Sequence, residues 1–267
     1  MAAPWFQNEI IAETASALPG LEVEVVPEID STSSELMRRA REGRCDPVLL
    51  VAERQTAGRG RMGRVWQSGV QAGAGDTQTS LTFSLGLPLA PKDWSGLSLA
   101  VGVSVAESVD GASSMRVALK WPNDLWVDDH KLGGILIETA LPLGSLAGRY
   151  LVIGIGLNIG AREAVGLSTA PAWLQQWRPG VTPGQVLREV VPPLARAVQV
   201  FGERGFAPFA ERFAARDALF NREVQLSDGT IGRCDGVGWG GELRVLTAAG
   251  LKLVASAEIS VRPRTAT

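Results

Sequence analysis

The pattern of the sequence changes near residue 220, and this change divides the chain into two predicted parts. From Phe220 onward, short apolar runs alternate with the turn-forming sequences SDG, GWGG and AAG. Closely spaced strands and turns of this kind are typical of a small antiparallel barrel or sandwich. We therefore predict a domain boundary near Leu219, with a larger domain over residues 1–219 and a small β-domain over residues 220–267.

The larger part combines apolar runs of strand length with segments of helical periodicity. Strands are predicted at DPVLLVAE, SLTFSLGL, MRVALKWP, DLWV, KLGGILIETA and RYLVIGIGLNIG. Helices are predicted after the capping hydroxyls of Ser31–Ser33, over Ser95–Ser108, over PAWLQQW, from Thr182 to about Arg204, and over FAPFAERFAARDAL. Pro192 and Pro193 are expected to break or kink the helix that contains them. These elements predict an α+β fold in which helices pack on a sheet.

Charge and residue usage narrow the classes of function. The net charge is −2, so the chain is not a general polycationic binder of nucleic acid. Cys45 and Cys234 lie far apart without CxxC spacing, which indicates two idle thiols in a reducing cytosol. The single histidine, His130, lies in a charged turn. An enzyme with this composition is expected to work by positioning and electrostatics, without a histidine base.

Targeting signals are not evident in the sequence. The start, MAAPWFQNEIIAET, has no basic region and carries Glu9, so it does not resemble a signal peptide. No apolar run reaches the ~18 residues that a membrane span needs. We expect a cytoplasmic protein without a membrane partner.

The stretch TAGRGRMGR, Thr56–Arg64, places three arginines and three glycines in nine residues. By itself it is also compatible with a flexible Arg-Gly segment that binds single-stranded nucleic acid. KWPND by itself is compatible with a tight turn. GIGLN is a weak dinucleotide signal, because the GxGxxG spacing that opens a helix is absent. Glycines at 154 and 156 predict close approach by a ligand or another backbone segment.

Four stretches in this order resemble the biotin protein ligases: DSTS at 30–33, ERQTAGRGRMGRVW at 53–66, KWPNDLWVDDHKLGGILIE at 120–138 and VIGIGLNIG at 152–160. The resemblance runs from about Glu28 to the C-terminal strands. It implies a mixed sheet with packed helices, followed by a small SH3-like β-barrel. Because little chain precedes Asp30, it also implies a short form without the N-terminal DNA-binding domain of some members, and hence no DNA partner.

The resemblance implies a biotin–[biotin carboxyl-carrier protein] ligase. Such an enzyme joins biotin and ATP into biotinyl-5′-AMP, with Mg²⁺ and release of pyrophosphate, and then transfers biotin to a lysine of the biotin carboxyl carrier protein. It would be a monomer or a homodimer. Guanidinium groups suit the neutralisation of a carboxylate and a polyphosphate. Thr56–Arg64 is therefore expected to be a mobile cationic lid, disordered when empty, that excludes water from the adenylate.

The resemblance also assigns roles to single residues. Those expected to bind biotin are Ser31, Thr32, Ser33, Gln55, Arg59, Gly60, Arg61 and Lys131. Those expected to bind ATP or the adenylate are Arg64, Trp66, Lys120, Asn123 and Asn158. Those expected to act in the reaction are Lys131, Arg61 and Asp124, with Asp124 also a candidate Mg²⁺ ligand. Those expected to let strands approach the biotin chain are Gly133, Gly134, Gly154 and Gly156. Trp121 is expected in the core.

Two departures from the family pattern limit this transfer of roles. Ser33 stands where many members have asparagine, which removes an amide donor. The small, polar segment Ser68–Ser80 is longer than usual and is expected to be mobile. The alternatives are a lipoate–protein ligase-like acyltransferase and, from another class, a single-stranded nucleic-acid binder that uses the Arg-Gly loop. A biotin-responsive repressor would need the missing domain.

Overall fold

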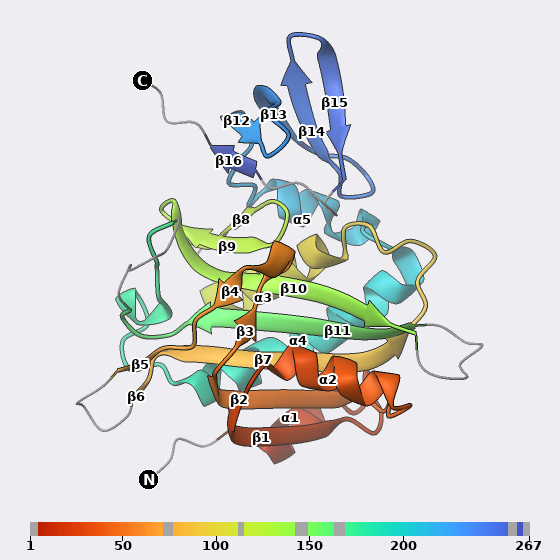
Figure 1. The fold of residues 1–267 in the computed structure, drawn as a ribbon, viewed down its shortest axis with the longest axis vertical. Coiled ribbons are helices and arrows are strands. Elements are labelled where there is room, and N and C mark those ends of the chain that lie inside the picture. The colour runs from red at the N-terminus through yellow and green to blue at the C-terminus, as the bar shows by residue number, and fades with distance from the viewer. Residues whose placement is uncertain are drawn as a thin grey trace.

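A seven-stranded mixed sheet forms the centre of the protein in the computed structural model (Figure 1), which describes residues 5–71, 77–111, 115–141, 149–162, 169–255 and 261–263. In spatial order its strands are β1 (Glu22–Ile29), β2 (Val48–Gln55), β7 (Ser80–Leu89), β11 (Arg149–Asn158), β10 (His130–Ala140), β9 (Asp124–Val127) and β8 (Ala118–Lys120). The β1–β2 pair is parallel and the other pairs are antiparallel. The predicted mixed sheet is confirmed, although β1 was not foreseen.

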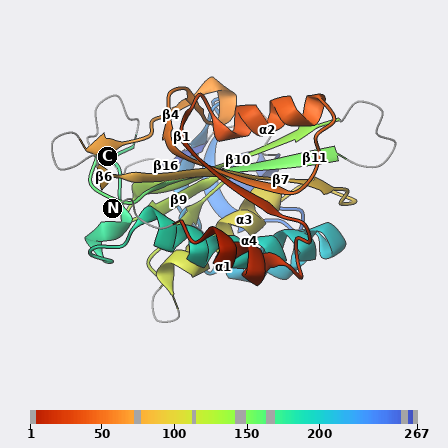
Figure 2. The ribbon, with the colours of Figure 1, turned by 90° about the horizontal axis from the view of Figure 1, so that it is seen from below.

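Helices cover both faces of this sheet. Figure 2 shows α2 (Thr32–Arg41) on one face, and α1 (Gln7–Thr14), α3 (Leu97–Asp110) and α4 (Pro183–Arg204) on the other. Strand β2 explains the arrangement, because successive side chains of a strand point to opposite faces. Leu49 and Val51 pack in the cluster with α3 and α4, whereas Val48 and Leu50 pack in the cluster with α2. An unbroken apolar run therefore indicated a strand that is buried on both sides.

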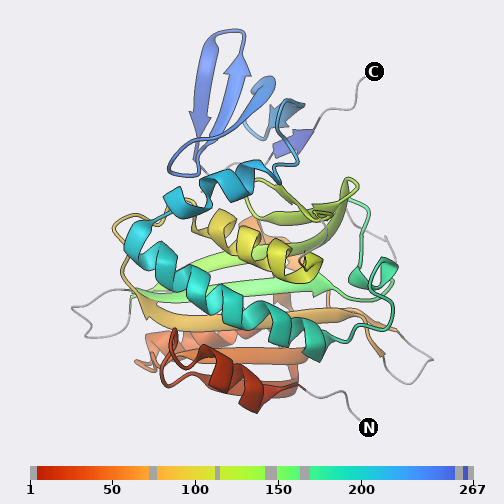
Figure 3. The same ribbon diagram turned by 180° about the vertical axis from the view of Figure 1, so that it is seen from behind.

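The helix α4 runs without interruption through Pro192 and Pro193, so the predicted break is wrong. Each proline removes a backbone donor. However, α4 lies beside α3 on the same face of the sheet (Figure 3), and its residues Val191, Leu194 and Val198 are buried in the core. Tertiary packing of this apolar face outweighs the local cost of the prolines.

Two of the other predicted helices are shorter in the structure. PAWLQQW forms only the 3₁₀ turn η2 (Leu174–Gln176). FAPFAERFAARDAL forms the 3₁₀ turn η3 (Ala207–Phe209) and the short helix α5 (Ala210–Ala214). Residues 72–76, within the segment that was expected to be mobile, lie outside the described residues, and β5 (Val70–Gln71) pairs with β6 (Thr77–Gln78) around them.

The C-terminal strands form a second, antiparallel sheet (Figure 1). In spatial order they are β15 (Gly250–Val254), β14 (Leu243–Thr247), β13 (Ile231–Val237), β12 (Glu223–Leu226) and β16 (Val261–Pro263). Within the described residues β15 and β16 are the two edges, so closure into a barrel stays a prediction. Backbone bonds join Leu119 to Arg216 and Ala218, and Trp121 Nε1 donates to Gly241 O at 3.0 Å. These contacts fix the second sheet beside β8.

None of the helices in the described part of the chain combines the length and apolar character that crossing a membrane requires.

Candidate active site

The Arg-Gly segment folds as a short hairpin. Strand β3 (Gly58–Arg59) pairs with β4 (Val65–Trp66), and the 3₁₀ turn η1 (Arg61–Gly63) connects them. Gly58 is required there, because a Cβ at this position would lie 2.4 Å from the carbonyl oxygen of Trp66. Gly63 has a φ of +72°, which glycine adopts without strain. The structure describes this segment as a folded hairpin, and its disorder in the empty protein and its closure over the adenylate stay predictions.

A cavity of about 690 Å³ lies between this hairpin, the start of α2 and strands β9, β10, β11 and β16. Every residue that the family resemblance assigned to biotin, ATP or the reaction lines it, from Ser31 to Asn158. Seven cationic residues also line it: Arg59, Arg61, Arg64, Lys120, Lys131, Arg162 and Arg262. Asp124 is the single acidic residue of the lining in the described part of the chain. The cavity is therefore suited to a ligand with several negative charges.

Hydroxyl groups gather at one end of the cavity. Ser31 is the N-cap of α2, as predicted, and its Oγ accepts from Ser34 N at 3.3 Å. Thr32 donates to Gln55 Oε1 from both its backbone N, at 2.7 Å, and its Oγ1, at 3.0 Å. Ser84 Oγ lies 2.7 Å from Thr32 Oγ1 and 2.9 Å from Ser33 Oγ. These contacts hold the side chains of α2 in fixed positions.

Ser84 was missed by the sequence analysis. It is fully buried in β7, and it lies behind the hydroxyls of Thr32 and Ser33. The available signal was a polar residue inside the apolar strand SLTFSLGL, since a buried hydroxyl needs a partner.

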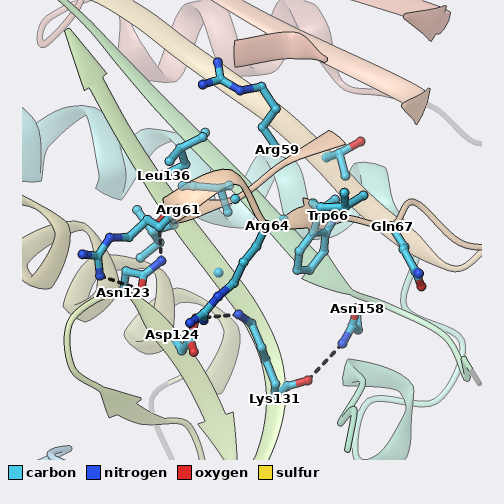
Figure 4. Close-up of a pocket in the computed structure, with 18 of the residues that line it drawn as sticks. Arg59, Arg61, Arg64, Trp66, Gln67, Asn123, Asp124, Lys131, Leu136 and Asn158 are labelled. Carbon is cyan, nitrogen blue, oxygen red and sulfur yellow. Dashed lines mark hydrogen bonds and ion pairs between the residues drawn. The ribbon is translucent and has the colours of Figure 1, made fainter. Parts of the chain in front are cut away.

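Charged groups gather at the other end (Figure 4). Lys131 Nζ donates to Asp124 Oδ1 at 2.6 Å, and Lys120 Nζ lies 3.9 Å from Asp124 Oδ2. Arg61 Nη1 donates to Asn123 Oδ1 at 3.5 Å. One carboxylate thus holds two ammonium groups beside a guanidinium.

Burial lowers the pKa of two of these groups, Lys120 and Arg61. Desolvation lowers the pKa of Lys120 to about 8; Asp124 opposes this shift, whereas Lys131, Arg64 and Arg262 add to it. Desolvation likewise lowers the pKa of Arg61, and Asp124 again opposes the shift. Removing charged groups from water disfavours their charged form, so both residues would be stabilised by an anionic ligand.

Arg59 takes a different direction from the other arginines of the hairpin. Its Nη2 lies 2.9 Å from Glu138 Oε1, and its Nη1 is 3.5 Å from Ser34 Oγ. Figure 4 shows its side chain pointing away from Arg61, Arg64 and Lys131. It lines the cavity, but its guanidinium fastens the hairpin to β10, an arrangement that does not support its predicted role around the biotin chain.

Glycines of β11 make room for side chains of the protein itself. A Cβ at Gly154 would lie 2.4 Å from Ser33 Oγ, and one at Gly156 would lie 2.4 Å from the ring of Trp66. A ligand or another backbone segment was expected at both positions. Of the four glycines expected to allow close approach to the biotin chain, only Gly133, on β10, meets backbone, since its Cβ would lie 2.6 Å from Gly156 O.

Asn158 and Trp121 have mainly structural contacts. Asn158 is 2% exposed, and its Nδ2 donates to the carbonyl oxygens of Lys131, at 3.0 Å, and Ala172, at 2.9 Å. Trp121 is fully buried, which confirms its placement in the core. The oxygen of the Asn158 amide accepts from Arg162, another residue of the cavity lining.

Two further cationic residues of the cavity were not foreseen. Arg162 follows β11, and its Nη1 donates to Asn158 Oδ1 at 2.7 Å. Arg262 comes from β16 of the second sheet. No local pattern marks either residue, because only the packing of distant segments brings them to the cavity.

The residues present do not fit a resident metal ion. Within the described residues no three histidine, cysteine, aspartate or glutamate side chains gather at one place. Asp124 already accepts from Lys131, so the single carboxylate of the cavity is paired with an ammonium group. The prediction of Asp124 as a metal ligand therefore finds no support. Cys45 and Cys234 are both free thiols.

Comparison with known proteins agrees with this fold and cavity. Residues 26–158 match the biotin/lipoate A/B protein ligase family. The chain is 30% identical over 239 residues to the biotin--[acetyl-CoA-carboxylase] ligase of Paracoccus denitrificans, which covers 86% of this chain and 96% of that protein. The chain therefore belongs to the biotin/lipoate A/B protein ligase family. Within it, the resemblance to biotin protein ligases is confirmed.

Two other similarities support this placement. The chain is 34% identical over 211 residues to the bifunctional ligase/repressor BirA of Escherichia coli, covering 78% of this chain but only 63% of that protein. It thus spans less than two thirds of that relative. The biotin protein ligase from Aquifex aeolicus, solved in complex with biotin and ATP, superposes with a TM-score of 0.73 at 29% identity, covering 91% of this chain and 99% of that one.

Proposed function

We propose that the protein is an ATP-dependent biotin protein ligase. It activates biotin as biotinyl-5′-AMP with release of pyrophosphate, and then transfers biotin to a lysine of a biotin carboxyl carrier domain. The observation that supports this proposal is the cavity of about 690 Å³, which has hydroxyl groups at one end and a cluster of cations at the other. The biotin protein ligase from Aquifex aeolicus, solved in complex with biotin and ATP, has the same fold.

The hydroxyl end is suited to the ureido ring of biotin. This ring is neutral and offers N–H donors and a carbonyl acceptor, which Ser31, Thr32, Ser33 and Gln55 match in kind. Because Ser84 orients the hydroxyls of Thr32 and Ser33, the donors and acceptors are positioned before the ligand binds. The ring therefore binds without ordering these side chains.

The cationic end is suited to the first reaction. The biotin carboxylate attacks the α-phosphorus of ATP, a new O–P bond forms, and the bond to the departing pyrophosphate breaks. Both reactants are anions that repel each other. Lys131, Arg61 and Arg64 lie where they reduce this repulsion, and charge-assisted hydrogen bonds to phosphate are short and strong. Asp124 holds Lys131 and Asn123 holds Arg61 before the charge develops, which lowers the barrier.

The nucleotide is assigned to the part of the cavity near β4, β11 and β16. Trp66 offers an aromatic face to adenine and Asn158 borders the same part of the cavity, whereas Asn123 lies beside Arg61 at the reacting end. Lys120, Arg64 and Arg262 are placed to contact the phosphates. Arg262 would make the second sheet part of the nucleotide site, so residues 220–267 would complete a site built mainly by residues 1–219. Mg²⁺ enters this proposal only as part of the MgATP substrate.

In the second reaction the ε-amine of the acceptor lysine attacks the activated carbonyl of biotin. An amide bond forms, the bond to AMP breaks, and the amine gives up a proton. The carboxylate of Asp124 is the nearest acidic group of the cavity to the cationic cluster, and it is a candidate acceptor of this proton. The hairpin of Thr56–Arg64 covers the cavity and limits hydrolysis of the mixed anhydride.

Biotin-dependent ATP–pyrophosphate exchange tests this proposal, with lipoate in parallel reactions. Exchange with biotin alone supports biotin ligation, and exchange with lipoate alone would assign the chain to the lipoate–protein ligases instead. Absence of exchange with both acids would reject the adenylation step. Transfer is then tested with a purified biotin carboxyl carrier domain and with the same domain whose acceptor lysine is replaced by arginine.

A further inference from the structure

Arg162 lies over the ring of Trp66. Its Cζ is 5.7 Å from the ring centroid. Its Nη1 donates to Asn158 Oδ1 at 2.7 Å, and its Nη2 donates to Gln67 Oε1 at 3.4 Å. This single guanidinium therefore contacts both residues that the proposed function assigns to the adenine end of the nucleotide, although no part of that proposal uses it.

The surroundings of Trp66 show where a base has access. A Cβ on Gly156 would lie 2.4, 2.6 and 2.8 Å from three atoms of the ring, so Gly156 lies against one face of the indole. A planar ligand that stacks on Trp66 must therefore use the remaining face. Arg162, which also lines the cavity, lies over the indole ring of Trp66.

The distance between the Arg162 guanidinium and the Trp66 ring bears on whether a base can enter between them. Atoms in stacking contact lie ~3.5 Å apart, so a base between two flat groups needs about 7 Å between them. The 5.7 Å from Arg162 Cζ to the Trp66 centroid joins two points and is shorter than that width. The guanidinium therefore has to move away from the indole before one planar ring can enter between the two groups.

The guanidinium is also incompletely satisfied. Within the described residues its Nε is buried without a hydrogen-bond partner. Burial lowers the pKa of Arg162, as expected for a charge removed from water. A guanidinium plane stacks on aromatic rings and nucleobases, and this contact would offset part of the cost of burying the charge.

We propose that Arg162 and Trp66 are the two walls of a slot that binds the planar base of the nucleotide. The inference rests on the proposed function, because it assumes that a nucleotide occupies this end of the cavity. Arg162 stacks on the face of the base opposite to Trp66, and its link to Asn158 sets its position.

Calorimetry with α,β-methylene-ATP, which the first reaction cannot cleave, tests this proposal. Arg162→Ala should weaken binding of this analogue about tenfold, the range of a partly desolvated stacking contact. Arg162→Lys should weaken it similarly, because an ammonium group keeps the charge but lacks the plane. Binding of inorganic tripolyphosphate and of biotin should stay unchanged in both variants.

Arg149→Ala is the matched control. This arginine lies at the opposite end of β11, is exposed, and donates to Thr139 Oγ1 at 3.2 Å. It should bind the analogue like the parent protein. Retained affinity for biotin in the Arg162 variants shows that their cavity is folded.

Three results would overturn the inference. Unchanged or tighter binding of the analogue by Arg162→Ala would make Arg162 a side chain that the base displaces. Rescue by Arg162→Lys, or an equal loss for tripolyphosphate, would reduce its role to charge. If the parent protein bound biotin but not the analogue, the proposed function would itself fail, and the slot with it.

Discussion

Lys131 Nζ lies 2.6 Å from Asp124 Oδ1, and the two residues belong to the two strands of the β9–β10 hairpin. The same carboxylate lies 3.9 Å from Lys120 Nζ. Because Asp124 balances two ammonium groups, the empty cavity keeps its cations close together without strong mutual repulsion. Ligand anions would then compete with Asp124 for these cations, and this competition leads to the predictions that follow.

Replacement of Lys131 tests the reacting end. Lys131→Ala should lower the rate of biotin-dependent ATP–pyrophosphate exchange by about 10²–10³-fold, the usual loss when one positioned electrostatic group is removed. Biotin affinity should change much less, because the hydroxyl end is intact. The exposed Lys92→Ala variant is the control. Exchange close to that of the parent protein would remove Lys131 from the reaction.

Binding of α,β-methylene-ATP should depend on the protonation of Lys120. Burial lowers the pKa of this lysine to about 8, so it is charged below that pH and loses its proton as the pH rises through it. Affinity for the triphosphate should therefore fall above about pH 8, and binding there should take up a proton. Calorimetry in buffers of different ionisation enthalpy measures this uptake.

Two variants separate Lys120 from its neighbours Lys131, Arg64 and Arg262. Lys120→Met should bind the analogue more weakly and without this pH dependence. Asp124→Asn removes the group that raises the pKa of Lys120, so the fall in affinity should move to lower pH. The same pH profile in the parent protein and in Lys120→Met would assign the titration to another group.

Ser84 is expected to act through Thr32 and Ser33. Ser84→Ala removes hydrogen-bond partners at 2.7 and 2.9 Å from these hydroxyls, and a net hydrogen bond contributes about 0.5–1.5 kcal/mol. Biotin affinity should fall by roughly 3–10-fold, with the affinity for the ATP analogue unchanged. Ser104→Ala, a buried serine whose hydroxyl has no partner among the described residues, should affect neither ligand. A loss of both affinities in Ser84→Ala would indicate a folding defect.

The hairpin arginines should differ in their effect on the adenylate. Arg61→Gly removes the half-buried guanidinium beside Asn123 and should speed release of biotinyl-5′-AMP. Arg59→Ala breaks an ion pair with Glu138 on a side chain that is 47% exposed, so it should act only through the position of the hairpin. Its effect should be several-fold smaller and should be reproduced by Glu138→Gln. Stopped-flow fluorescence measures the rate of adenylate release in both variants. Equal rates in Arg61→Gly and Arg59→Ala would contradict the arrangement in Figure 4.

Several features could be predicted because local sequence determines them. Ser31 caps α2 because its hydroxyl lies within one turn of the free backbone N–H groups. The run VLLVA forms a strand with both faces buried, since period-two alternation sends apolar groups to both sides. The residues assigned to biotin, ATP or the reaction were foreseen by resemblance to a family, and they do line one cavity. In these cases the residues that matter are near neighbours in the chain or belong to a recognisable set.

Other features depend on contacts between distant segments. Ser84 meets Thr32 and Ser33 only because β7 lies beneath α2, and Arg262 reaches the cavity only because the second sheet packs beside β8. Arg59 has a long side chain with many rotamers, and Glu138, 79 residues away, selects one of them. The prolines of α4 are tolerated because packing against α3 outweighs their local cost. The sequence by itself determined which chemical groups this protein has and indicated most strands of the central sheet, because those properties are local. Only the tertiary structure decided which groups meet, because that depends on how strands far apart in the chain are ordered in the two sheets.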